Sequence, residues 1–140
     1  MAKIKIINVV AGIIINQEGE ILTTKRKPNR VWGNYWEFPG GKIKRGETAK
    51  AALTRELDEE LGIKTKIGPL VMSPINYDYS YGQVKLQFYY VKMLSADIKL
   101  TAASQFKWLV PAELVEFDWP PANQPLIEYL VNHSLPLKNF

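Results

Sequence analysis

The sequence has no cysteine and only one histidine, His133, among its 140 residues. Without cysteine the chain cannot form disulfides, thiolate-ligated zinc sites, iron–sulfur clusters or a thiol nucleophile. The histidine lies near the end of the sequence, where we expect a surface residue, so a histidine-based triad and a multi-histidine metal site are also excluded. Any catalysis must therefore depend on carboxylates, lysine or arginine, hydroxyl groups, or a metal ion held by oxygen ligands.

The sequence also lacks a hydrophobic run long enough to cross a bilayer. Its most apolar stretch, residues 6–15, contains Asn8 and is much shorter than the roughly 20 residues that a membrane helix needs. Two lysines precede this stretch, but no small-residue cleavage pattern follows it, so we expect neither a signal peptide nor a membrane anchor. Together with the absence of cysteine, this favours a cytoplasmic protein.

The composition is typical of a globular domain, with 46% hydrophobic and 23% charged residues. A chain of this length can bury a core by itself, so we expect a single domain over residues 1–140. The net charge of +4 raises the question of nucleic acid, but the lysines are scattered without a long run. We therefore expect no stable nucleic-acid partner and a small phosphate-bearing substrate, which a mildly basic surface suits.

Hydrophobic periodicity predicts an α/β fold, with a mixed sheet flanked by helices. Residues 6–15 predict a buried strand, and residues 21–24 predict its return strand in a hairpin turning at 18–20. Further strands are expected at residues 36–38, 66–72, 84–93 and 105–110. The first of these should end in a glycine-rich turn at 39–41. Helical segments are expected at residues 48–61, 111–114 and 122–132.

The helix predicted at 48–61 combines an apolar stripe with an acidic face. Three leucines repeat at intervals of four residues, namely Leu53, Leu57 and Leu61. Glu56, Glu59 and Glu60 fall within an arc of about 100°. Such close carboxylates repel one another unless Arg55 or a divalent cation lies among them, and oxygen-only ligation suits Mg²⁺ or Mn²⁺. Taken alone, the pattern also fits an ordinary solvated helix face rich in glutamate.

The residues around this helix resemble the complete Nudix box. Gly41 is followed after five residues by Glu47, and after seven more by residues 55–63, which match all the remaining fixed positions. Segments 36–43 and 119–127 resemble the MutT branch of this family, the 8-oxo-dGTP diphosphatases. The resemblance implies the Nudix fold, an α/β/α sandwich, and hydrolysis of a nucleoside diphosphate linked to another moiety.

The resemblance also implies roles for individual residues. The implied ligands of Mg²⁺, or of Mn²⁺ as a substitute, are Glu56, Glu59, Glu60 and the backbone carbonyl of Gly41. Arg55 would orient a glutamate of this cluster, and Glu47 would support the loop or the metal shell. The cations would neutralise charge on the phosphate oxygens and help to generate or orient the attacking water.

For substrate binding, the resemblance points to Arg26 in the nucleotide site, the backbone around Phe38 against the base, and Asn123 reading the base. 8-Oxoguanine presents the acceptor O6 beside the donor N7–H, which a carboxamide complements, whereas guanine presents two acceptors. Cytosine, with its N3 acceptor and its N4 amino group, also complements a carboxamide. Asn123 by itself equally suits a helix N-cap or a turn.

One feature of the MutT branch is missing. Many members carry a glutamate six residues before a tryptophan, but here Ala102 stands six residues before Trp108 and the loop 101–105 has no acid. Glu47 or a helix glutamate would then act as the base, since the nearest upstream acid, Asp97, would require a shift in register.

The sequence therefore predicts a Mg²⁺-dependent Nudix hydrolase that converts a nucleoside triphosphate to the monophosphate and pyrophosphate. The expected substrate is 8-oxo-dGTP, which implies sanitisation of the nucleotide pool. One alternative is the same chemistry on CTP or a modified dCTP. Another is a catalytically weak Nudix module that binds nucleotides, suggested by Ala102. The resemblance implies attack at the β-phosphorus, and both a monomer and a homodimer remain open.

Overall fold

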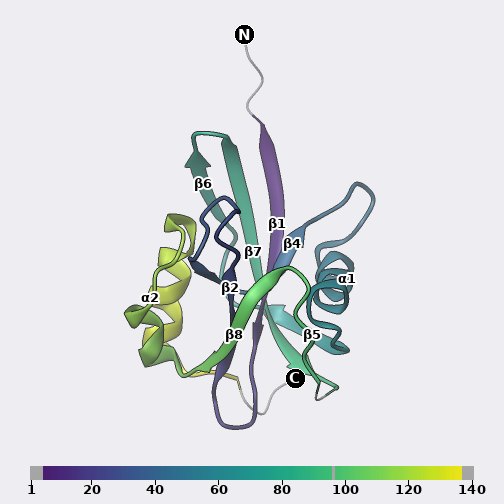
Figure 1. Cartoon of the computed structure of the whole chain (residues 1–140), viewed down its shortest axis with the longest axis vertical. Coiled ribbons are helices and arrows are strands. Elements are labelled where there is room, and N and C mark those ends of the chain that lie inside the picture. The colour runs from purple at the N-terminus through teal and green to yellow at the C-terminus, as the bar shows by residue number, and fades with distance from the viewer. Residues whose placement is uncertain (1–4, 96, 137–140) are drawn as a thin grey trace.

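In the computed structural model, which describes residues 5–95 and 97–136, two β-sheets lie between two α-helices (Figure 1). The strands of the five-stranded sheet are β1 (Ile6–Ile14), β4 (Gly40–Lys42), β5 (Thr65–Leu70), β6 (Ile75–Tyr79) and β7 (Gly82–Met93). The strands of the three-stranded sheet are β2 (Ile21–Arg26), β3 (Trp36–Glu37) and β8 (Ala103–Leu109). The helices are α1 (Ala49–Leu61), α2 (Gln124–Asn132) and the 3₁₀ helices η1 (Pro111–Glu116) and η2 (Pro121–Asn123).

The order of the larger sheet is β4-β1-β7-β5, with β6 also paired to β7, and that of the smaller sheet is β3-β2-β8. The strands β1 and β7 run parallel, and the other pairings are antiparallel. The predicted α/β fold with a mixed sheet between helices is therefore confirmed, although the strands divide between two sheets. In the described part of the chain, no helix is long and apolar enough to cross a membrane.

The hairpin predicted from the first two strands is wrong. Although β2 follows β1 closely, the two strands belong to different sheets, and a single isolated bridge between Ile15 and Ile21 joins them. The turn itself is local, because the Asn16 side chain accepts hydrogen bonds from the backbone N–H groups of Glu18 and Glu20. The partner of β1 is not the next strand in the sequence but β7, with which β1 forms a long parallel ladder.

The glycine-rich turn predicted at residues 39–41 is also wrong, because Gly40 and Gly41 lie in β4, paired with β1. A side chain on Gly40 would place its Cβ 2.0 Å from the carbonyl oxygen of Val10. The glycine is therefore required by the close approach of two strands. The strand β6 was not predicted. The other predicted elements occur, with ends shifted by a few residues.

Helix α1 begins and ends at clear local signals. The Thr48 side chain accepts a hydrogen bond from the Ala51 N–H, and Gly62 closes the helix in the left-handed conformation with φ 65°. The leucine stripe is buried, as predicted, against Val10 and Ile14 of β1. This packing fixes the rotation of α1 about its axis and directs its acidic residues toward β4.

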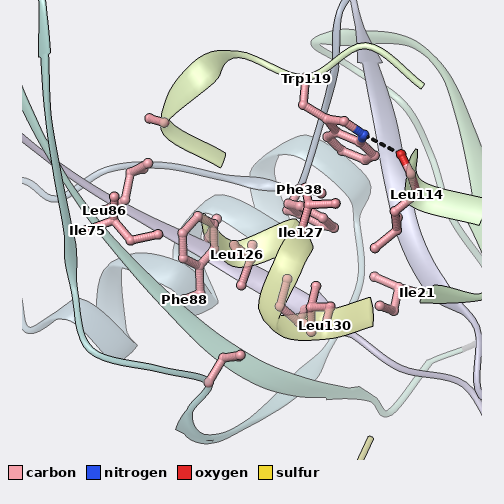
Figure 2. Close-up of a cluster of buried hydrophobic side chains, with 14 of the residues drawn as sticks. Ile21, Phe38, Ile75, Leu86, Phe88, Leu114, Trp119, Leu126, Ile127 and Leu130 are labelled. Atoms are coloured by element: carbon pink, nitrogen blue, oxygen red, sulfur yellow. Dashed lines mark hydrogen bonds between the residues drawn. The ribbon is translucent and has the colours of Figure 1, made fainter. Parts of the chain in front are cut away.

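A second core lies on the opposite side, beneath α2 (Figure 2). The rings of Phe38 and Trp119 stack with their centroids 4.8 Å apart, and the Trp119 indole Nε1 donates a hydrogen bond to the Leu114 carbonyl oxygen at 2.7 Å. The side chains that α2 buries here are Leu126, Ile127 and Leu130. This packing anchors the chain just before η2 and so places the residues that follow Trp119.

Candidate active site

A cavity of about 500 Å³ brings several of the predicted site residues together. Its floor is the apolar face of the larger sheet, formed by Ile7, Val9, Val84 and Leu86. The lining residues at its acidic end are Glu37, Gly40, Gly41, Glu60 and Ala102. Elsewhere its walls come from the loop between β2 and β3, from β6, and from η2 with Asn123. The cavity therefore connects an acidic region with an apolar region that carries one carboxamide.

Arg55 organises the acidic residues beside this cavity. Its guanidinium binds both oxygens of Glu47 at 2.7 and 2.9 Å, and its Nη1 reaches Glu56 at 2.9 Å and Glu59 at 3.2 Å. Hydrogen bonds from Arg55, and from the backbone N–H of Lys44, lower the pKa of Glu47 to about 2. The sequence suggested that either Arg55 or a divalent cation lies among the carboxylates. Arg55 indeed contacts three of the four glutamates at this site, and Glu60 is the exception.

Glu60 is the remaining acid. Burial, together with the nearby carboxylates of Glu37 and Glu56, raises the pKa of Glu60 to about 8. No lysine or arginine of the described residues lies within ion-pair distance of it. Burial also raises the pKa of Glu37, even though the guanidinium of Arg26 lies 2.6 Å away. The acidic end therefore holds buried carboxyl groups whose ionised forms Arg55 does not stabilise.

These residues fit an oxygen-liganded divalent cation. The carboxyl group of Glu56 fills the space where a Cβ on Gly41 would lie, 2.4 Å from that position, so a carboxylate and the strand backbone meet without a side chain between them. Three carboxylates and nearby backbone carbonyls form a hard-donor set. Within residues 5–95 and 97–136, however, no three acidic or histidine side chains already converge as a metal site, and Arg55 takes up Glu56 and Glu59 instead.

The residues predicted to bind substrate have different surroundings. Arg26 and Asn123 line the cavity, whereas Phe38 is buried in the core and is not among the lining residues (Figure 2). The Asn123 side chain donates to the Pro120 carbonyl oxygen at 3.3 Å and does not cap α2. Arg26 is engaged with Glu37 and with the Val31 carbonyl oxygen.

The cavity also contains residues that sequence reasoning did not assign to the site. They are mainly charged or aromatic, and include Lys27, Trp32, Glu37, Tyr79 and Tyr81. The Tyr79 hydroxyl accepts a hydrogen bond from the backbone N–H of Ala122, which ties β6 to η2. Glu37 lies within segment 36–43, which resembles the MutT branch, so the sequence could have indicated that it belongs to the site. The others come from loops and strands whose proximity depends on the tertiary fold.

A family model described as a NUDIX domain matches residues 10–129. The chain belongs to the Nudix family. The Nudix chain is 34% identical to the 8-oxo-dGTP diphosphatase of Escherichia coli (strain K12), over 90% of this chain and 97% of that protein. It is also 34% identical to the CTP pyrophosphohydrolase of the same organism, over 89% of this chain and 90% of that protein. The solved structure of the MutT protein from Methanosarcina mazei Go1 matches with a TM-score of 0.83 and 25% identity. The match covers 93% of this chain and 96% of that structure's chain.

The predicted membership of the Nudix family is thus confirmed, and this Nudix hydrolase has the fold expected for it. Nudix hydrolases generally use a divalent metal ion, which agrees with the hard-donor set beside Gly41. The loop position noted in the sequence, Ala102, lines the acidic end of the cavity, and Asp97 does not line it. The described part of that loop therefore presents no carboxylate to the cavity.

Proposed function

We propose that this Nudix hydrolase cleaves a nucleoside triphosphate to the monophosphate and pyrophosphate, and that its substrate is 8-oxo-dGTP. The observation that carries the proposal is the cavity that extends from Glu60 of α1, at the acidic end, to Asn123. Its apolar floor suits a flat base, and its acidic end suits phosphates bound through a cation. The extensive similarity to an 8-oxo-dGTP diphosphatase supports this choice.

At the acidic end, the residues proposed to hold Mg²⁺, with Mn²⁺ as a substitute, are Glu56, Glu59, Glu60 and the carbonyl of Gly41. When bound, the ion would offset the charge on the phosphate oxygens and make water a better nucleophile. Arg55 would keep Glu56 and Glu59 oriented. One water molecule adds to the attacked phosphorus, and the bond from this phosphorus to the oxygen bridging the α- and β-phosphates breaks. The other product leaves with that oxygen, and one proton of the water passes to a carboxylate. By resemblance, the attacked atom is the β-phosphorus.

Glu47 is assigned a supporting role in this scheme. Arg55 occupies both of its carboxylate oxygens, and its pKa of about 2 makes it a weak proton acceptor at neutral pH. Glu47 therefore orients Arg55, which in turn orients Glu56 and Glu59. The proton acceptor is then one of the glutamates of α1, since Ala102 supplies none.

At the other end, Asn123 would read the edge of the base. Its Nδ2 is already directed at the Pro120 carbonyl, while its side-chain oxygen has no hydrogen-bond partner among the described residues. That oxygen can accept the N7–H of 8-oxoguanine, whereas the N7 lone pair of guanine would face it unpaired. A buried mismatch of this kind costs about 1–3 kcal/mol, which corresponds to a discrimination of about fivefold to 150-fold.

A second candidate is hydrolysis of CTP or a modified dCTP. It is favoured by the equal identity to a CTP pyrophosphohydrolase and by the match between a carboxamide and the N3/N4 edge of cytosine. The two candidates would use the same acidic end and differ only in the base that they recognise. A comparison of nucleotides with different bases therefore decides between them.

The test is pyrophosphate release with Mg²⁺ from 8-oxo-dGTP, dGTP, CTP and 5-methyl-dCTP, compared as kcat/KM. We expect 8-oxo-dGTP to exceed dGTP by about 100-fold or more. A preference for the pyrimidines would replace the first candidate with the second. Tight nucleotide binding without turnover of any substrate would overturn both and identify a binding module.

A further inference from the structure

The loop between β7 and β8 is fastened to the end of α1 that carries the acidic cluster. The backbone N–H of Lys99 donates to the Leu61 carbonyl at 2.8 Å, and that of Thr101 donates to the Glu60 carbonyl at 3.1 Å. The Thr101 hydroxyl also donates to the Glu59 carbonyl at 3.0 Å. These bonds satisfy carbonyls that a helix otherwise leaves free at its C-terminus. Residues 99–101 are therefore held against the end of α1, and Ala102 lines the cavity.

Lys27 reaches this loop from the end of β2, the strand that pairs with β8 through Arg26 and Ala103. It follows β2 directly, lines the cavity, and points its ammonium group at the Thr101 carbonyl oxygen at 3.5 Å. This distance is longer than that of a strong N–H···O hydrogen bond, and the side chain is exposed. The ammonium group is thus located at the acidic end but remains free to move onto a better acceptor.

The charges at this end leave Lys27 without a carboxylate partner. Arg26 is paired with Glu37, and Arg55 with its three glutamates, whereas Lys27 has no ion pair among the described residues. A lysine ammonium binds phosphate well as a point charge. Phosphates brought next to Glu60 by a cation would lie at the end of the cavity where Lys27 is located.

We propose that Lys27 binds the terminal phosphates of the substrate, those released as pyrophosphate, by moving from the Thr101 carbonyl onto a phosphate oxygen. The inference rests on the proposed function for the identity of the substrate. It predicts a selective role, because Lys27 would contact the two phosphates that become pyrophosphate and not the nucleoside monophosphate.

The test compares Lys27→Met, which removes the charge but retains the length, with Lys27→Arg, which retains the charge. Lys25→Met is the matched control, since Lys25 lies in β2, two residues before Lys27, and does not line the cavity. Inorganic pyrophosphate and a nucleoside monophosphate are titrated into each protein by calorimetry with Mg²⁺ present, and KM and kcat are measured for the triphosphate.

For Lys27→Met we expect a rise of about tenfold in the Kd of pyrophosphate and in the KM of the triphosphate. The Kd of the monophosphate should stay within about twofold, Lys27→Arg should recover most of the loss, and Lys25→Met should match the wild type. Unchanged pyrophosphate binding, equal effects of Lys25→Met, or an equal loss of monophosphate binding would each overturn the proposal. Because pyrophosphate binding needs no turnover, an inactive wild-type enzyme would reject the proposed function and still leave this test decisive.

Discussion

Replacing Gly41 by alanine tests the geometry of the proposed metal site directly. The added Cβ would lie 2.4 Å from the carboxyl carbon of Glu56 and 2.6–2.7 Å from its two oxygens. Ordinary contacts of a Cβ begin at 3.4 Å, so the carboxylate must retreat by about 1 Å. A side-chain end can move at little cost, and we expect the free energy of unfolding to fall by about 1 kcal/mol or less.

The activity of Gly41→Ala should fall far more than its stability. A displacement of about 1 Å in a group that positions the reacting atoms can lower the rate about 100-fold. Pyrophosphate release from 8-oxo-dGTP measures this loss as kcat/KM. Electron paramagnetic resonance of Mn²⁺ should show a weaker affinity in the same variant. Urea unfolding provides the free energy of unfolding for comparison.

The matched control is Gly46→Ala. Gly46 has a φ of 87°, and no described atom outside residues 45–47 lies within 4 Å of the position of its Cβ. Alanine there strains the backbone by about 1–2 kcal/mol but displaces no carboxylate. We expect this variant to lose stability and retain activity. If Gly41→Ala keeps kcat/KM and Mn²⁺ affinity within about threefold of the wild type, the placement of Glu56 against Gly41 is wrong.

Three other substitutions address Glu56, which lies beside the cavity, and two residues that line it, Asn123 and Ala102. Glu56→Gln should lower metal-dependent hydrolysis at least about 100-fold with an unchanged fold, because it removes a charge proposed to hold the cation. Asn123→Ala should raise the Kd of 8-oxo-dGMP about tenfold while changing that of dGMP little, as measured by calorimetry. Ala102→Glu should place a carboxylate at the acidic end and lower the half-saturating Mg²⁺ concentration about fivefold.

A control variant or a result that would contradict the prediction accompanies each of these substitutions. Asp58→Asn changes an exposed acid of the same helix, paired with Lys64, and should retain activity. High residual activity in Glu56→Gln would argue against the metal assignment. Equal loss of both monophosphates in Asn123→Ala would show that this residue does not read the base. An unchanged Mg²⁺ requirement in Ala102→Glu would place residue 102 out of reach of the cation.

The secondary structure that depends on neighbouring residues was predictable. The helix expected at 48–61 occurs at Ala49–Leu61, because Thr48, Gly62 and the leucine stripe act within a few residues along the chain. The strand containing Leu86, Phe88 and Tyr90 likewise places these three side chains in one core, as their alternation implies.

The errors concern contacts between segments distant in the sequence. Nothing local distinguishes a hairpin of β1 and β2 from the observed parallel ladder of β1 with β7. The glycines of β4 look like a turn until β1 is placed against them, since the close approach to Val10 is what requires them. Phe38 illustrates the same limit, because it stacks on Trp119, which is 81 positions away in the sequence.

By itself, the sequence determined the family and the chemical repertoire of the chain, because the spacing of Glu56, Glu59 and Glu60 on one helix follows from helical geometry and the absence of cysteine removes other chemistries. The electrostatics depended on the tertiary structure. Only folding brought Arg55 onto Glu47, left Glu60 with no lysine or arginine of the described residues within ion-pair distance, and placed Glu60 and Asn123 in one cavity. Charge and burial at such a site are sums over several elements, and only the packed chain determines them.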